Sequence, residues 1–272
     1  MWIKTIILLL FIALSSSSGL MAQQPNRCNN TFNGDYLLSY GHAAWFTIKQ
    51  PLQYKAKDWA VVGGAVAATA LVYVYDEEIF NFFDNHFPDE TQDEFCIWAD
   101  SYGSGYLSIP MLGGFYLAGV ICKDNRAKHA ALAGLQSFVI AGATGWIIKH
   151  TTQRARPSQQ EVLDPRVWEG PFGGHGYNAF PSGHTICAFA LATTLAGIYN
   201  DKPWLGAGMY ALAGLTAYSR AVSGKHWPSD ILAGAALGYG IGRAVLLFNR
   251  SKQAKCIEPS ISANGIGMRV KL

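Results

Sequence analysis

Pro181-Ser182-Gly183-His184 lies where a glycine-rich loop turns into an apolar run. A serine at such a point can cap the helix that the sequence predicts from Thr185 onward, and a glycine lets a backbone amide approach a ligand closely. The free N–H groups and positive dipole at a helix N-terminus favour an anion. His184 would stand beside that anion as a group that gives or takes a proton near neutral pH. A Pro-Ser-Gly turn is common, so this stretch needs support from elsewhere in the chain.

Two further polar clusters supply that support, since each lies at the end of another apolar run. The run before the loop ends at Lys149, and Arg156-Pro157 follows after six residues. A later run ends at Ser219-Arg220, with His226 after five residues and Asp230 after three more. If the runs are helices packed up and down with short connections, these ends meet at one end of a bundle. The sequence therefore predicts one anion site built from three separate segments.

The apolar runs predict an all-α fold, a helical bundle of about six core helices. The runs are Trp59–Tyr75, Ser101–Cys122, Ala130–Ile148, Thr185–Asn200, Pro203–Ser219 and Ile231–Phe248. Pro110 is expected to kink the second of them. Half of the residues are hydrophobic and only 14% are charged, against roughly 25% charged in ordinary soluble proteins. This composition and the number of runs favour a membrane-embedded bundle, with a soluble exported bundle as the alternative.

The three polar clusters together resemble the signature of the type 2 phosphatidic acid phosphatase (PAP2) and vanadium haloperoxidase superfamily. They match every signature position in order, as Lys149-x6-Arg156-Pro157, Pro181–His184 and Ser219-Arg220-x5-His226-x3-Asp230. The flanking apolar runs extend the similarity over most of residues 58–248. The resemblance implies a bacterial exported or membrane-bound phosphatase.

The same resemblance implies hydrolysis of a phosphomonoester or pyrophosphate through a phosphohistidine. His226 would attack phosphorus, His184 would protonate the leaving oxygen and then activate water, and Asp230 would orient His226. The phosphate oxygens would be bound by Lys149, Arg156, Ser182, Gly183 and Arg220. Three cations would take the place of metal ions and no metal-ligand pattern is present, so no metal or other cofactor is expected.

Several functions and substrates stay open at this point. The alternatives are a soluble periplasmic non-specific acid phosphatase, a vanadate-dependent haloperoxidase and a non-catalytic lipid-binding membrane bundle. A site in a membrane favours a lipid phosphate, such as phosphatidic acid, phosphatidylglycerol phosphate, a polyprenyl diphosphate or a lipid A phosphate, over a small phosphoester. The net charge of +3 without a basic block does not suggest nucleic acid as a partner.

The chain divides into four parts. Residues 1–22 are typical of an export signal, residues 23–57 form a lead-in, residues 58–250 form the phosphatase domain, and residues 251–272 form a tail. Basic residues lie in the turns opposite the signature clusters, which places the site on the periplasmic side of a multi-pass inner-membrane protein by the positive-inside rule. The cell envelope is therefore the expected location.

Some segments are expected to lie outside the site. Acidic residues recur through 76–100, which is expected to be a solvated connection. His150, Gln153 and Arg154 adjoin the first cluster without belonging to the signature, and they are as readily surface groups as lining groups. Glycines in the loop 158–180 indicate mobility or close turns. Cys28 is a candidate partner for Cys96, although connectivity cannot be deduced from spacing, and Cys187 is expected to be a small buried residue.

Overall fold

The computed structural model describes residues 31–87, 92–255, 257–262 and 265–270, so the expected signal segment 1–22 lies outside the described residues. The helices are α2 (Gly34–Lys49), α3 (Ala56–Val74), α4 (Asp76–His86), α5 (Gln92–Ser104), α6 (Ser108–Ile121), α7 (Asn125–Thr152), α8 (Gly183–Ile198), α9 (Pro203–Val222) and α10 (Pro228–Lys255). Short 3₁₀ turns occur at Gln50–Gln53, Pro157–Gln159 and Gly170–Phe172. Two strands, β1 (Ile257–Ser262) and β2 (Gly265–Val270), pair antiparallel.

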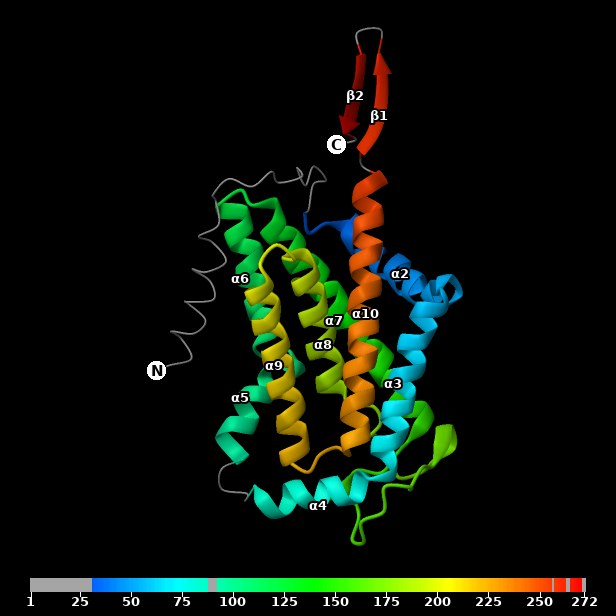
Figure 1. Cartoon of the computed structure of the whole chain (residues 1–272). Helices are drawn as coiled ribbons and strands as arrows, with labels where there is room; N and C mark the ends of the chain where they lie inside the picture. Colours follow the sequence, from blue (N-terminus) through cyan, green and yellow to red (C-terminus); the bar gives the residue numbers. More distant parts are fainter. Residues whose placement is uncertain (1–30, 88–91, 256, 263–264, 271–272) are drawn as a thin grey trace.

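The four helices α7 to α10 run up and down beside one another, with α8 packed against the other three (Figure 1). Side chains of α8 such as Ile186, Leu191 and Leu195 are almost completely buried at the centre of the core. The expected all-α bundle is confirmed for this part of the chain. In the tail, α10 continues to Lys255 and the β1–β2 hairpin extends beyond it (Figure 1).

Three glycines spaced four residues apart let α10 lie against the backbone of α8. A Cβ atom built at Gly238 would lie 2.4 Å from the Ile186 carbonyl oxygen, and one at Gly242 would lie 2.6 Å from that of Ala190. A Cβ at Gly234 would lie 2.9 Å from the Ser182 carbonyl oxygen. Close approach through small residues is typical of helix pairs in membranes. It also brings the start of α10 next to the turn that begins α8.

The second apolar run is broken, but not at the expected residue. Helices α5 and α6 meet at an angle of 58°, and the break contains Gly105 with a φ of 99°. Pro110 lies in the first turn of α6, where its missing N–H has no intrahelical partner to lose. The kink expected at Pro110 is therefore wrong, and glycine causes the bend instead.

Three described helices are long and apolar enough to cross a membrane, and the bent pair α5–α6 would make a fourth. The three are α3, α7 and α10, whereas α8 is apolar but only 16 residues long. None of the spanning window of α3 is buried in the protein. Its exposed large apolar side chains are Trp59, Val61, Val62, Val66, Leu71 and Val74. An exposed apolar surface of this extent indicates contact with lipid, so the chain is membrane-associated.

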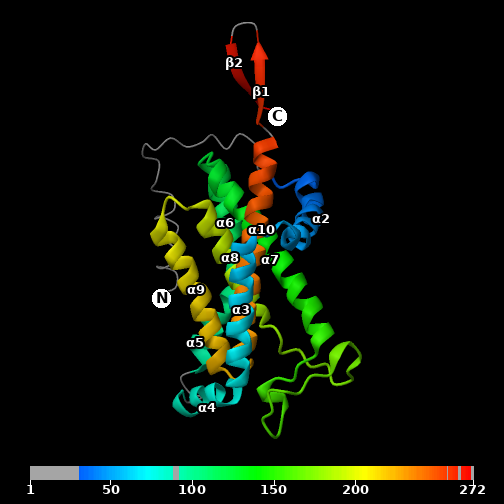
Figure 2. The ribbon, with the colours of Figure 1, turned by 45° about the vertical axis from the view of Figure 1, so that its right-hand side comes forward.

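The lead-in is part of the bundle at the end farther from α4. The Tyr36 hydroxyl in α2 donates to the Leu132 carbonyl at 2.9 Å, and Gln136 Nε2 donates to Ser39 Oγ at 2.9 Å. Helix α4 crosses the other end of the molecule, where the loop between α7 and α8 also lies (Figure 2). The two ends of the molecule therefore differ. The helix ends that carry the predicted polar clusters lie at the same end of the molecule as α4 (Figure 1).

Candidate active site

The ends of α7 and α9 and the starts of α8 and α10 meet beside α4 (Figures 1 and 2). Lys149 lies in the last turn of α7 and Arg220 in the last turn of α9. His184 and Asp230 lie in the first turns of α8 and α10. The up-and-down order of the helices thus brings together residues that are up to 81 positions apart, from 149 to 230, in the sequence.

His226 lies in the connection between α9 and α10, and its side chain is 1% exposed. Its Nδ1 atom is 3.7 Å from Asp230 Oδ2 and has no hydrogen-bond partner among the described residues. The same carboxylate oxygen accepts the Trp227 N–H at 3.0 Å, and the Trp227 indole donates to the Ala155 carbonyl at 2.9 Å. Asp230 therefore faces His226 from a turn that the first signature cluster helps to hold.

Three cations surround His226. Burial, followed by the charges of Lys149, Arg156 and Arg220, holds the pKa of His226 well below its usual range. Both effects disfavour the imidazolium, because a charged ring would lose hydration and meet like charges. The ring is therefore neutral at physiological pH, with a lone pair available for chemistry.

The turn that begins α8 differs in one detail from expectation. Ser182 occupies the N-cap position and is completely buried, but its side chain accepts no backbone N–H. Its Oγ accepts a hydrogen bond from the Thr185 hydroxyl at 2.9 Å instead, while the Ser182 N–H donates to the Asp230 carbonyl at 3.0 Å. A Cβ atom built at Gly183 would lie 3.4 Å from Lys149 Cε. The Lys149 side chain therefore lies against the first turn of α8.

The cationic side chains are only partly satisfied by protein atoms. Lys149 Nζ donates to the carbonyl oxygens of Asn178 and Ala179. Arg220 pairs with the Asp100 carboxylate through one terminal nitrogen. The Nε atoms of Arg156 and Arg220 are buried without a hydrogen-bond partner in the part of the chain that the structure describes. Buried donors left without partners are costly, so these arginines are suited to an anion that enters the site.

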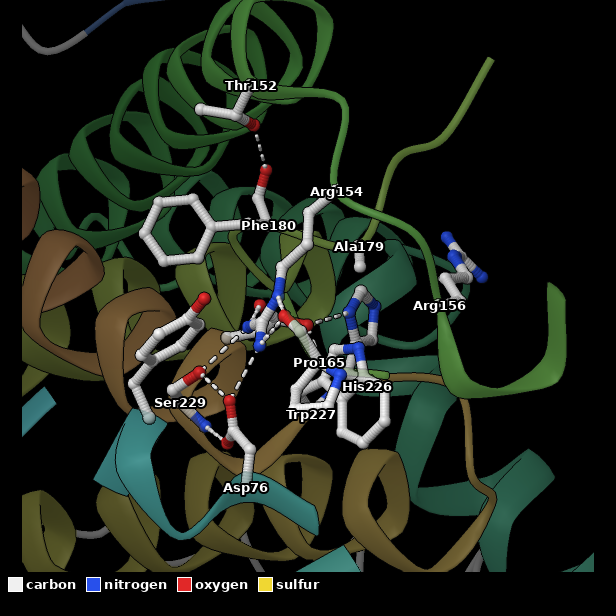
Figure 3. A network of polar contacts seen from close by, with 12 residues as sticks. Asp76, Thr152, Arg154, Arg156, Pro165, Ala179, Phe180, His226, Trp227 and Ser229 are labelled. Carbon is white, nitrogen blue, oxygen red and sulfur yellow. Dashed lines mark hydrogen bonds and ion pairs between the residues drawn. The ribbon is translucent and has the colours of Figure 1, made fainter. Parts of the chain in front are cut away.

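The sequence left Arg154 open between a surface group and a lining group, and the structure excludes a surface group. Its side chain is completely buried. Its Nη1 donates to Asp230 Oδ1 at 2.5 Å and its Nη2 to Asp76 Oδ2 at 2.7 Å. Its Nε and Nη2 also donate to the Pro165 carbonyl at 3.0 and 2.8 Å (Figure 3). The residue is thus the centre of a buried network that includes a predicted site residue.

The solvated connection expected for residues 76–100 is also wrong at two carboxylates. Asp76 is completely buried at the start of α4, where it accepts the Ser229 N–H at 2.8 Å and the Ser229 hydroxyl at 2.6 Å. Burial raises the pKa of Asp76. Asp100 pairs with Arg220 as described above. No local pattern marks these aspartates, since their partners lie 78 to 153 residues away along the chain.

The glycine-containing loop after α7 is tied to the site by backbone hydrogen bonds. The Ala155 N–H donates to the Val167 carbonyl at 3.0 Å, and the Ala179 N–H donates to the Arg154 carbonyl at 2.9 Å. His150 is exposed and bonds the Trp146 carbonyl, so it lies outside the network. Across the described residues, no group of three or more His, Cys, Asp or Glu side chains could hold a metal ion.

Three cysteines, Cys96, Cys122 and Cys187, lie in the described part of the chain. Cys187 is buried in α8, as expected for a small apolar side chain. Cys122 is exposed beyond the end of α6. Cys28, the candidate partner of Cys96, lies outside the described residues, so that pairing stays a prediction.

The chain is similar in sequence to known phosphatases. The sequence model of the PAP2 superfamily matches residues 130–254. A lipid A 1-phosphatase from Porphyromonas gingivalis is 44% identical over 70 residues, which are 25% of this chain and 16% of that protein. An undecaprenyl-diphosphatase from Sulfolobus acidocaldarius is 25% identical over 70% of this chain and 85% of its own length.

A solved structure shares the fold. The transmembrane PAP2-type phosphatidylglycerolphosphate phosphatase from Bacillus subtilis superposes with a TM-score of 0.52 at 17% identity. The superposition covers 80% of this chain and 95% of that one.

Proposed function

We propose that this chain, whose residues 130–254 match the sequence model of the PAP2 superfamily, is a metal-independent phosphatase acting on a phosphomonoester or pyrophosphate of a lipid, with its catalytic domain in residues 58–250. One observation carries the proposal: a neutral, buried His226 lies among Lys149, Arg156 and Arg220. A phosphate group that enters this space meets three positive charges and one nucleophile. The two arginine Nε donors that lack protein partners would bind its oxygens.

The chemistry divides between the two histidines. His226 Nε2 attacks phosphorus while the bond to the leaving oxygen breaks, and His184 donates a proton to that oxygen. Burial, followed by the charge of Arg220, lowers the pKa of His184 to about 4 in the structure, so His184 takes up this proton when the negatively charged substrate binds beside it. His184, now neutral, then takes a proton from a water molecule that attacks the phosphohistidine and releases inorganic phosphate. The Nδ1–H of His226 donates a hydrogen bond to the Asp230 carboxylate, which stabilises the positive charge that the ring gains. The resting distance of 3.7 Å shortens in the reacting complex, as is common at such sites.

The remaining phosphate oxygens are bound by the turn that begins α8. Ser182 and the Gly183 amide would supply hydrogen bonds that strengthen as charge shifts onto the equatorial oxygens. The helix N-terminus adds its own preference for an anion. Lys149 would exchange its present carbonyl partners for phosphate.

A lipid substrate is favoured by the position of the site at one end of a membrane bundle. Helix α3, with its exposed apolar side chains, runs along the bundle and ends next to α4 at that end (Figure 1). The similar proteins are named for lipid A, undecaprenyl diphosphate and phosphatidylglycerolphosphate. Basic residues gather at the opposite end, at Lys55, Lys57, Lys123, Arg126, Lys128, Arg250 and Lys252. By the positive-inside rule this end faces the cytoplasm, so the site faces the periplasm of a bacterial inner membrane.

The test is release of inorganic phosphate by protein purified in detergent, with EDTA present throughout. The panel contains phosphatidic acid, phosphatidylglycerol phosphate, a polyprenyl diphosphate, a lipid A phosphate and para-nitrophenyl phosphate. We expect release from at least one lipid, inhibition by vanadate, and no release by His226→Ala. Activity that disappears with EDTA and returns with magnesium or zinc would contradict the proposal. Vanadate-dependent bromide oxidation without phosphate release would instead show a haloperoxidase.

A further inference from the structure

Arg154 forms ion pairs with two buried carboxylates at this end of the molecule, Asp76 and Asp230. All three side chains are completely buried. Ser229 completes the network by accepting an Nη1 hydrogen bond from Arg154 at 2.8 Å and donating its hydroxyl to Asp76 at 2.6 Å (Figure 3). Asp230, in turn, is the carboxylate nearest to His226 Nδ1.

The position of Arg154 is fixed from several sides. Aromatic rings of Tyr73 and Trp168 each lie 4.9 Å from its guanidinium carbon, and the ring of Trp227 lies at 5.6 Å. Two hydrogen bonds to one carbonyl oxygen, that of Pro165, fix the plane of the guanidinium. A planar, pre-organised fork held in this way orients the carboxylates that it contacts.

The charges of the network explain why a second carboxylate is present. Arg154 and Asp230 alone would form a neutral pair, which would offer little to a positively charged His226. The hydrogen bonds that Arg154 and Ser229 donate favour the ionised form of both carboxylates against the effect of burial. With Asp76 included, the three buried groups then carry a net charge of −1. That charge opposes the positive charge which His226 gains when it bonds to phosphorus.

We propose that Arg154 and Asp76 are positioning residues that orient Asp230 towards His226 Nδ1 and leave one net negative charge behind the nucleophile. The inference rests on the proposed function of the same site. Neither residue touches the substrate, because both are fully enclosed behind Asp230. They act through Asp230 on the tautomer and the charge of His226.

The first experiment compares Asp76→Asn with Glu77→Gln. Asparagine keeps the shape of Asp76 and can still accept a hydrogen bond from Ser229, but it removes the extra negative charge. Glu77 is the adjacent residue and is exposed, so its variant controls for a charge change on α4. We expect Asp76→Asn to lower kcat at least about tenfold, which corresponds to ~1.4 kcal/mol, with KM within twofold of wild type. Glu77→Gln should match wild type.

The pH profile of kcat/KM distinguishes a positioning role of Asp76 and Arg154 from a role in stabilising the fold alone. Loss of the negative charge makes the His226 imidazolium less stable, so the acid limb of kcat/KM should move to lower pH in Asp76→Asn. Arg154→Lys keeps the charge but cannot bond both carboxylates and Pro165 at once, and it should also lower kcat. Met209→Ala serves as a stability control, because this buried residue lies in α9 away from the network. It should lower the melting temperature without changing kcat or the profile.

A second measurement needs no substrate. In protein labelled with ¹⁵N-histidine, the His226 signal, identified by its loss in His226→Ala, reports which ring nitrogen carries the proton. We expect a proton on Nδ1 in wild type and a mixture of tautomers in Asp76→Asn. The inference is overturned if Asp76→Asn has the kcat, pH profile and tautomer of wild type, or if its loss of kcat equals that of an equally destabilised Met209→Ala. If the wild-type protein hydrolyses no phosphoester, the proposed function is refuted. The inference is then tested by the His226 tautomer alone, compared between wild type and Asp76→Asn.

Discussion

Gly238→Ala tests whether the contact between α10 and α8 sets the geometry of the site. The added methyl group would lie 2.4 Å from the Ile186 carbonyl oxygen, 2.9 Å from Phe189 Cβ and 3.1 Å from the Ala190 nitrogen. Two of these are backbone atoms that cannot rotate away. The helices must therefore separate, which carries Asp230 on α10 away from the turn that begins α8.

The magnitude follows from two opposing terms. Overpacking a well-packed contact costs roughly 1–3 kcal/mol, whereas replacing glycine by alanine within a helix gains up to about 1 kcal/mol. With the full gain subtracted, a net loss of up to ~2 kcal/mol is expected for Gly238→Ala. Gly240 provides the matched control, because a Cβ atom there would meet nothing within 4 Å. Gly240→Ala should be neutral or slightly stabilising.

The assay is thermal unfolding of the two variants in the same detergent, followed by phosphate release at a temperature where both are folded. Gly238→Ala should melt below wild type and lose activity, since a displacement approaching 1 Å at a catalytic group can reduce the rate by as much as about 100-fold. A Gly238→Ala protein that is as stable and active as Gly240→Ala would refute the reasoning.

Three further outcomes are expected. His184→Ala should still form a phosphoenzyme from para-nitrophenyl phosphate, whose leaving group needs little protonation, whereas His226→Ala should form none; labelled phosphate on His226→Ala would show another nucleophile. Because burial and three cations lower the pKa of His226, kcat/KM should stay high below pH 6.5. Arg156→Gln removes one of those cations, so the acid limb of kcat/KM should move to higher pH. An unchanged limb would contradict this. Two single-cysteine proteins are compared in cells whose outer envelope is permeable: one has Val162→Cys in a cysteine-free background, and the other retains only Cys122. An impermeant thiol reagent should label the first protein and not the second. Labelling of the second protein alone would place the site in the cytoplasm.

The features that the sequence could predict are those with a local pattern. The apolar runs produce helices, such as the 16 residues of α8 and the 28 residues of α7, because in a membrane their backbone groups can bond only within the segment. Their alternation places the ends of α7 and α9 beside the starts of α8 and α10. The positions of Lys149, His184 and Asp230 at one end of the bundle follow from that order alone.

The features that could not be predicted depend on pairing between distant segments. Arg154 is polar and adjoins a loop, which normally indicates exposure. It is buried because Asp76 and Asp230 arrive from α4 and α10 to balance its charge. In the same way, Asp100 differs from its acidic neighbours only because α5 passes beside Arg220. Composition describes the segment correctly as acidic, but it contains no information about which carboxylates find a partner.

The buried network also has a consequence for how the chain assembles. The bonds of Arg154 to Asp230 and Asp76 close loops of 76 and 78 residues, and the bond between Ser229 and Asp76 closes one of 153. Contacts of such high sequence separation form late, because the loop entropy must be lost before they contribute. Until α4, α7 and α10 have all docked, at least one charge lacks its partner, at a cost of about 3–5 kcal/mol once buried. A fragment that begins after Asp76 can therefore keep apolar helices in a membrane while lacking an ordered catalytic end.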